Sequence, residues 1–264
     1  MDNFVFHKPS SIDDAIEAVD GKDEPKFLAG GQSLIPVMKL DMAQPSDLVS
    51  LAGVAELREI KDDGDKLIIG AMATHASVAD SDTVAKAIPT IAEMAGHIGD
   101  AQVRNRGTMG GSVAHADPAA DYPAALVALK AIVRTHKREI AAEDFFTELF
   151  ETALEEGELI TAIHFTKPKR SWYEKFQSPA SKYAIAGVCV AEYDDGVRVA
   201  VTGAGNKVFR HGAMEKALSA NFDPSALGGI DVDASDLRTD VEASAEYRAH
   251  LVEVMAKRAV KNAK

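Results

Sequence analysis

The chain has 264 residues, 46% of them hydrophobic, so it is long enough to bury the core of one large domain or two ordinary ones. Lys and Arg total 29 against 41 Asp and Glu, a formal net charge of −12 that, without a basic run, argues against nucleic-acid binding. No apolar stretch approaches the ~20 residues of a membrane helix and the N-terminus lacks a signal peptide, so we expect a soluble, cytoplasmic protein.

The first hundred residues alternate between short strands and helices. Ser10 and Ser11 precede the amphipathic run 12–19, which predicts a capped helix with an acidic first turn. Apolar runs bounded by turn residues predict strands at 26–29, 47–51 and 66–71. Helical patterns follow at 34–38, after Thr74 or Ser77, and at 88–98.

The remainder begins with a segment rich in glycine and polar residues, 100–121, which predicts a long loop. A helical turn is expected at 124–129, and strands at 131–135, 138–142 and 158–165. Proline and charge at 167–171 indicate a linker. Beyond it we expect a hairpin formed by 183–193 and 197–202, and an amphipathic helix at 244–264 with an apolar face of Tyr247, Leu251, Val254 and Met255. The sequence thus predicts an α+β protein of two units that divide near residue 170.

The first glycine motif is Ala29-Gly30-Gly31-Gln32-Ser33, between a predicted strand and a predicted helix. Paired glycines let a ligand approach the backbone, and successive N–H groups can then converge on an anion. The helix that follows directs its positive N-terminus to the same place. An ordinary turn between strand and helix has the same composition, so this motif alone leaves both interpretations open.

The second glycine motif lies at 103–112 and contains Gly107, Gly110 and Gly111 beside Thr108 and Ser112. It is neither a P-loop nor a dinucleotide fingerprint, because no Gly-Lys-Ser/Thr and no Gly-x-Gly-x-x-Gly is present. We expect another concavity rich in hydrogen-bond donors. Two separate glycine loops suit a ligand with two linked phosphates.

Together, residues 29–39, residues 104–111 and the Asp117-Pro118-Ala119-Ala120-Asp121 segment closely resemble the FAD-binding medium subunit of molybdenum hydroxylases, a family that includes xanthine dehydrogenase and carbon monoxide dehydrogenase. The resemblance runs almost end to end, although only the glycine motifs are highly specific. It implies a two-part FAD-binding domain of the p-cresol-methylhydroxylase type at 1–168, followed by a small C-terminal α+β domain at 169–264.

The resemblance also implies the residues that bind FAD. The pyrophosphate and nearby ribityl group would lie against the two motifs, at Ala29, Gly30, Gly31, Gln32, Ser33 and Leu34, and at Thr108, Gly110, Gly111 and Ser112. Asp121 would bind a ribityl or ribose hydroxyl, and His115 would lie beside the flavin. Lys175 would be a basic residue near the ring, and Tyr183 would cover one face of it. No catalytic residue and no metal ligand of this chain is implied.

Several residues keep a second interpretation. The family usually has asparagine where Ser112 stands and often arginine where Asp41 stands, but neither change removes a backbone donor. His115 could be a loop histidine satisfied by the protein, and His75 could lie away from the cofactor. Arg104 and Arg106 could neutralise phosphate or serve subunit contacts. Without the resemblance, Tyr183 would be interpreted as a core residue.

The implied function is electron transfer. FAD would receive electrons from 2Fe–2S clusters of a small partner subunit and pass them to an external acceptor, while a large partner subunit would carry molybdopterin. The single cysteine, Cys189, agrees with this, because a cluster typically needs four thiolates. We expect a dimer of heterotrimers and no substrate oxidation by this chain alone. The alternatives are a self-sufficient flavin-dependent oxidoreductase of the same fold and a flavin-free scaffold subunit.

Overall fold

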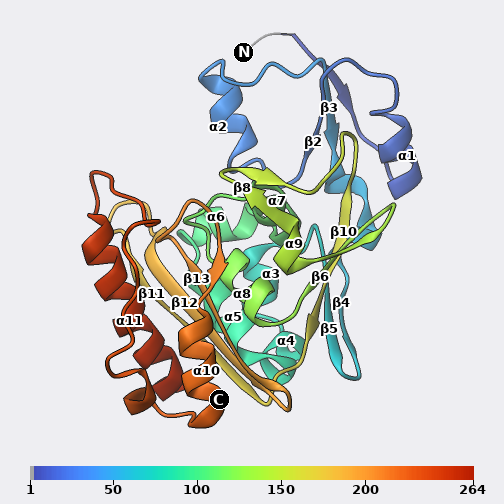
Figure 1. Ribbon diagram of the computed structural model, residues 1–264. Coiled ribbons are helices and arrows are strands. Elements are labelled where there is room, and N and C mark those ends of the chain that lie inside the picture. The colour runs from blue at the N-terminus through green and yellow to red at the C-terminus, as the bar shows by residue number, and fades with distance from the viewer. Residues whose placement is uncertain (1–2) are drawn as a thin grey trace.

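The computed structural model describes residues 3–264, and its mixture of sheets and helices confirms the predicted α+β class (Figure 1). The N-terminal sheet is parallel, with the strand order β1 (Val5–His7), β3 (Asp47–Ser50) and β2 (Pro25–Leu28). Two helices accompany it, α1 (Ile12–Glu17) and α2 (Leu34–Lys39). Ser11 caps α1 by accepting a hydrogen bond of 3.1 Å from the N–H of Asp14, as its position before the amphipathic run predicts.

A five-stranded antiparallel sheet forms the middle of the molecule. Its order is β4 (Ile60–Asp63), β5 (Lys66–Gly70), β10 (Ile160–Thr166), β6 (Ile132–Thr135) and β7 (Glu139–Ala141). All but β4 lie at predicted positions, and β4 escapes prediction because Ile60 is its only apolar residue. The helices of this part are α3 (His75–Ala79), α4 (Asp82–Ala87), α5 (Pro89–Gly96), α6 (Ala101–Arg106), α7 (Met109–His115), α8 (Tyr122–Ala128) and α9 (Ala142–Phe145). Shorter elements are the ribbon β8 (Phe146–Glu148) and β9 (Glu151–Thr152), and the 3-10 turns Leu51–Gly53 and Ala55–Arg58.

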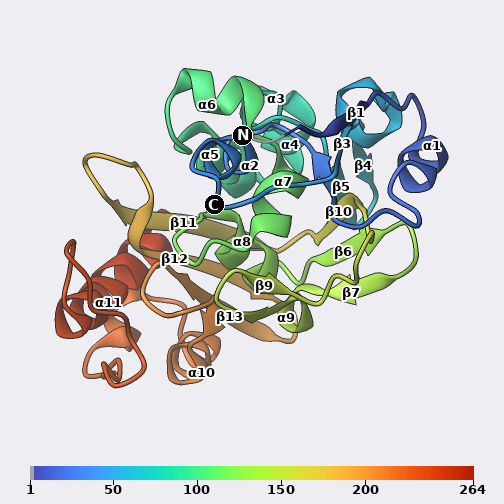
Figure 2. The ribbon, with the colours of Figure 1, turned by 90° about the horizontal axis from the view of Figure 1, so that it is seen from above.

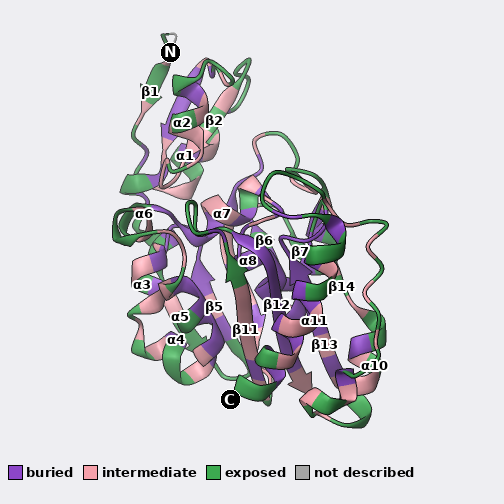
Figure 3. Cartoon of the chain, turned by 90° about the vertical axis from the view of Figure 1, so that its left-hand side faces the viewer, coloured by how far each residue is buried: buried purple, intermediate pink, exposed green. Residues whose placement is uncertain are grey.

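The C-terminal sheet is antiparallel and has helices on both faces. Its order is β11 (Arg170–Gln177), β12 (Ala184–Tyr193), β13 (Gly196–Thr202) and β14 (Phe209–Arg210). Helices α10 (Gly212–Ala220) and α11 (Ala245–Asn262) contact it from outside, and α8 contacts β12 and β13 from the middle of the molecule (Figures 1 and 2). The 3-10 turn Pro224–Leu227 lies between α10 and α11. Because β12 is covered on both sides, its first eight residues are all buried, in keeping with its continuous apolar run (Figure 3).

The prediction of one long loop at 100–121 is wrong. Helices α6 and α7 occupy most of this segment, and each begins at a side chain that caps it. Asp100 accepts a hydrogen bond of 2.8 Å from the N–H of Val103, and Thr108 accepts one of 3.2 Å from the N–H of Gly111. Glycine has a low helix propensity, so Gly110 and Gly111 hid α7, whereas α6 is a short and mostly polar helix; a capping side chain stabilises each of them.

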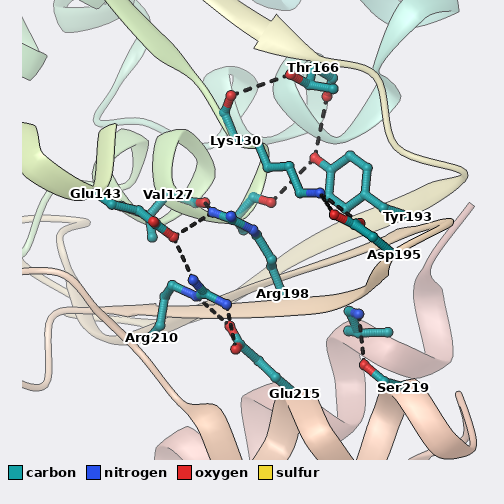
Figure 4. Close-up of polar contacts among 12 residues, drawn as sticks. Val127, Lys130, Glu143, Thr166, Tyr193, Asp195, Arg198, Arg210, Glu215 and Ser219 are labelled. Carbon is teal, nitrogen blue, oxygen red and sulfur yellow. Dashed lines mark hydrogen bonds and ion pairs between the residues drawn. The ribbon is translucent and has the colours of Figure 1, made fainter. Parts of the chain in front are cut away.

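The predicted linker at 167–171 is shorter than expected, because β11 begins at Arg170 and pairs with β12 along its whole length. Ion pairs also cross this junction. Lys130 lies 2.6 Å from Asp195, and Glu143 lies 2.5 Å from Arg198 and 2.6 Å from Arg210 (Figure 4). A division at 168/169 stays a prediction.

Buried apolar side chains form clusters in each part of the molecule. The largest includes residues of the middle sheet, α5, α7 and α8, together with Cys189 of β12. Cys189 is fully buried, and this burial raises the pKa of its thiol, so it is not placed to act as a nucleophile. Within residues 3–264, we find no helix that is both long enough and apolar enough to cross a membrane.

Candidate functional site

A cavity of about 650 Å³ lies where the first glycine motif, α7 and the turn before β12 meet. Its size falls in the range of small-molecule sites, roughly 300–1,000 Å³. The structure brings to it thirteen of the fourteen residues predicted to bind a cofactor: Ala29, Gly30, Gly31, Gln32, Ser33, Leu34, Thr108, Gly110, Gly111, Ser112, His115, Asp121 and Tyr183. Lys175 does not belong to the lining formed by residues 3–264.

The first glycine motif contributes unpaired backbone donors to this cavity. Within residues 3–264, the N–H groups of Gly30, Gly31, Gln32 and Ser33 donate no hydrogen bond to the protein. Ser33 stands at the N-cap of α2, where its side chain makes no capping hydrogen bond. Gln32 is exposed and the other three residues are half-buried, so these donors can be reached by a ligand from solvent. A row of four successive donors on a cavity wall therefore suits an anionic ligand such as a diphosphate.

Glycine stands at the two positions of this motif for different structural reasons. A Cβ atom at Gly30 would collide with the carbonyl oxygen of Arg106, so glycine at this position lets the two motifs touch backbone to backbone. Gly31 has a φ of +74°, a conformation that other residues adopt only with strain. The first glycine thus joins the motifs, and the second bends the chain around the cavity.

The second motif is not the donor-rich loop that its composition predicts. The N–H groups of Met109 and Gly110 donate to the carbonyl oxygens of Ala73 and Ala71, at 3.0 and 2.8 Å. The N–H groups of Gly111 and Ser112 donate to the side chain and the carbonyl oxygen of Thr108, at 3.2 and 3.0 Å. Because α7 packs directly on the residues after β5, its first donors are already satisfied. This motif forms a close-packed cavity wall.

Asp121 is the buried carboxylate of the cavity wall, with 5% of its surface exposed. The Tyr173 hydroxyl donates to Oδ1 at 2.5 Å, and the Lys175 ammonium donates to Oδ2 at 2.9 Å. Burial raises the pKa of Asp121, while Lys175 and Tyr173 oppose that shift. Lys175 therefore lies behind the cavity wall, in contact with a residue that lines it.

The C-terminal sheet positions the segment that leads to Asp121. The Thr202 hydroxyl lies 2.8 and 2.7 Å from the carbonyl oxygens of Pro118 and Ala120. The N–H groups of Gly203 and Ala184 donate to the carbonyl oxygens of Pro118 and Ala119, at 2.7 and 3.1 Å. Residues more than 60 positions later in the chain thus fix the edge of the cavity at Asp121.

The rings at the cavity have distinct environments. His75 is 4% exposed, its Nδ1 lies 3.2 Å from the Tyr122 hydroxyl, and burial lowers its pKa to about 4, so it is neutral at pH 7. His115, in the last turn of α7, packs its ring against Phe150 with 5.3 Å between centroids. Tyr183 is 42% exposed, so its interpretation as a core residue is wrong.

The arginines of the second motif do not line the cavity formed by residues 3–264. Arg104 donates to the carbonyl oxygens of Ile98 and Gly99, both at 3.1 Å, and this contact stabilises the turn before α6. The cationic side chains at the cavity are instead those of Lys26 and Lys182, which sequence reasoning missed. Lys182 has a φ of +66° in the turn before Tyr183, and no motif marks it. Within the described residues, no group of three or more His, Cys, Asp or Glu side chains could bind a metal ion.

Comparison with known proteins agrees with this geometry. Residues 2–168 match the family described as the FAD binding domain in molybdopterin dehydrogenase. The chain is 36% identical to the nicotine 6-hydroxylase medium subunit of Paenarthrobacter nicotinovorans, over 97% of this chain and 95% of that one. It is 34% identical to the carbon monoxide dehydrogenase medium chain of Hydrogenophaga pseudoflava, over 97% and 96%. The solved structure of carbon monoxide dehydrogenase from Hydrogenophaga pseudoflava, in a form lacking the Mo-pyranopterin moiety of its molybdenum cofactor, superposes with a TM-score of 0.90 at 32% identity, covering 98% of this chain and 96% of that one.

Proposed function

Because this chain belongs to the family of FAD-binding domains of molybdopterin dehydrogenases, we propose that it is the FAD-binding electron-transfer subunit of a molybdenum-dependent hydroxylase or dehydrogenase. Its FAD receives electrons from 2Fe–2S clusters of a small partner subunit and passes them to an external acceptor. A large partner subunit carries molybdopterin and oxidises the substrate. The whole assembly is a cytoplasmic dimer of heterotrimers.

The row of unpaired N–H groups at Gly30, Gly31, Gln32 and Ser33 is the observation that carries this proposal. FAD contains a pyrophosphate, and four successive unpaired donors on a cavity wall complement its negative charge. The glycine backbone also fits, since it lets the chain bend closely around that group. We propose that the first motif binds the pyrophosphate and that Thr108, Gly110, Gly111 and Ser112 form the wall against the ribityl group.

The remaining predicted residues would surround the rest of the cofactor. Asp121, Tyr183 and His115 line the cavity. Asp121 would accept a hydrogen bond from a ribityl or ribose hydroxyl, Tyr183 would cover one face of the ring, and His115 would lie beside it. When bound, FAD supplies the ability to accept electrons singly and to release them singly or in pairs. The protein supplies position, hydrogen bonds and exclusion of water.

Dependence on a partner is supported by the cysteine count. Cys189 is the only cysteine of the sequence, and it is buried among apolar side chains. The chain therefore has no thiolates for a cluster, and an electron donor must lie on another subunit.

We also propose that 1–168 and 169–264 are two units, of which the second positions Asp121 and Tyr183.

Flavin content and reducibility test this function. The chain, purified alone, is expected to contain FAD that acid precipitation releases unchanged. It should be inert toward aldehydes, purines and N-heterocycles until partners are supplied. Substrate oxidation by the isolated chain would support a self-sufficient oxidoreductase instead. A protein that neither contains nor takes up FAD would support a scaffold subunit.

A further inference from the structure

Lys175 has no hydrogen-bond donor left for a cofactor. Its ammonium donates to the carboxylate of Asp121 at 2.9 Å, to the carbonyl oxygen of Lys182 at 2.9 Å and to that of His97 at 3.1 Å. A lysine ammonium has three N–H donors, and these three acceptors use all of them. The side chain is also 7% exposed. Lys175 therefore joins the end of α5, the turn before β12 and Asp121, and contacts the cavity only through that carboxylate.

Tyr173 fixes the other oxygen of the same carboxylate. Its hydroxyl donates to Oδ1 of Asp121 at 2.5 Å, from a partly buried side chain that packs against the largest core cluster. A Cβ atom at Gly187 would collide with this hydroxyl, so the glycine of β12 provides the space it occupies. Each oxygen of Asp121 thus has one protein donor and keeps lone-pair capacity toward the cavity.

We propose that Lys175 and Tyr173 are positioning residues that keep Asp121 ionised and oriented as the acceptor for a hydroxyl of the bound FAD. This inference rests on the proposed function. A buried carboxylate without a cation takes up a proton more readily. Without Lys175, Asp121 therefore takes up a proton more readily, and its protonated form accepts a hydrogen bond from FAD less well.

The pH dependence follows from the groups around Asp121. Ionisable groups that face it come from every element packed on it: Lys175 and Tyr173 of β11, His97 after α5, Tyr122 of α8 and Tyr183 before β12. Lys175 is the cation in hydrogen-bond contact. With it, the affinity for FAD should change less between about pH 6 and 8 than it does without it. Without it, FAD binds more weakly as the pH falls, because a neutral carboxyl group accepts a hydrogen bond less strongly than a carboxylate does.

A double-mutant cycle tests whether Lys175 acts through Asp121. FAD dissociation constants are measured by titration of the apo-protein for Lys175→Met, Asp121→Asn and the double variant, alongside thermal unfolding. We expect Lys175→Met to weaken FAD binding by about tenfold, the size of a lost hydrogen bond to a charged group. In the Asp121→Asn background, the same change should alter the affinity by less than about twofold. If Lys175→Met does not fold, Tyr173→Phe, which removes a single oxygen atom, replaces it in the same cycle.

Lys169→Met is the matched control, since Lys169 precedes the same strand and pairs at the surface with Asp194. It should leave the affinity for FAD unchanged at every pH. Equal losses from Lys175→Met in both backgrounds, or a pH-independent loss, would overturn the inference. A wild-type protein that does not bind FAD would instead overturn the proposed function.

Discussion

Replacement of Gly110 by alanine should destabilise the fold before it affects the cofactor. The new Cβ would lie 2.5 Å from the Cβ of Ala71 and 2.8 Å from its Cα, where non-bonded carbons normally stay about 3.5–4.0 Å apart. The two segments cannot separate freely, because the N–H of Gly110 donates to the carbonyl oxygen of Ala71 at 2.8 Å. Overpacking of this kind costs about 1–3 kcal/mol, or roughly 3–9 °C in melting temperature for a chain of this size.

Thermal unfolding of the apo-protein, followed by circular dichroism, measures this effect without the cofactor. Gly212→Ala is the control, because a Cβ there meets nothing within 4 Å and the helix gains propensity without a clash. We expect a lower melting temperature for Gly110→Ala and an unchanged or higher one for Gly212→Ala. If Gly110→Ala melts like the wild type but has lost FAD, then position 110 approaches the ligand and the packing argument is wrong.

Three further changes separate the roles of the cavity residues. Gly31→Ala, at a φ of +74°, should weaken FAD binding through strain in the donor row, which titration of the apo-protein measures; an unchanged affinity would contradict this. The pKa of His75 is lowered to about 4 in the folded protein, so the unfolded chain takes up a proton first as the pH falls below 6.5, and the free energy of unfolding decreases. Urea unfolding of the wild type should show a loss of about 2 kcal/mol from this residue between pH 7.5 and 5, and His75→Gln should show a correspondingly smaller loss. Tyr183→Ala, at an exposed position, should change the rate at which the reduced flavin reacts with oxygen while leaving the melting temperature within about 1 °C, and the reverse pattern would return Tyr183 to a structural role.

Much of the fold can be predicted from local signals. Ser11, Thr74 and Ser244 each cap a helix where a polar residue precedes an apolar periodic run. The hairpin of β12 and β13 follows from two apolar runs around Asp194-Asp195-Gly196. These elements are predictable because their sequence pattern and their tertiary environment agree.

The failures have a common physical cause, which is tertiary contact that overrides local propensity. Glycines at 110 and 111 suggest a loop, but both are part of α7, where Gly110 packs on Ala71. The charged segment at 167–171 suggests a linker, yet Arg170 begins β11 because β12 offers it a pairing edge. Lys175 resembles a ligand contact in the sequence, although three protein acceptors occupy its ammonium. No one-dimensional pattern reports where such partners lie.

The two glycine motifs lead to the site, but for different reasons than their composition suggests. The first presents free donors, whereas the N–H groups of Met109, Gly110, Gly111 and Ser112 in the second are bonded within the protein. The sequence could not distinguish these cases, because the partners Ala71 and Ala73 lie more than 30 residues earlier in the chain. Both motifs line one cavity, and the role of their residues in binding FAD stays a prediction.

Anaerobic flavin reduction tests the central claim most directly. The purified chain is mixed with a reduced 2Fe–2S protein as electron donor, and separately with candidate aldehydes, purines and N-heterocycles, while the flavin absorbance is followed. We expect the iron–sulfur donor to bleach the flavin of the isolated chain rapidly and the organic substrates to leave it unchanged. An organic substrate should bleach the flavin only in the complete complex purified with this chain. Bleaching by an organic substrate in the isolated chain at an enzymatic rate, with no response to the iron–sulfur donor, would contradict the electron-transfer role.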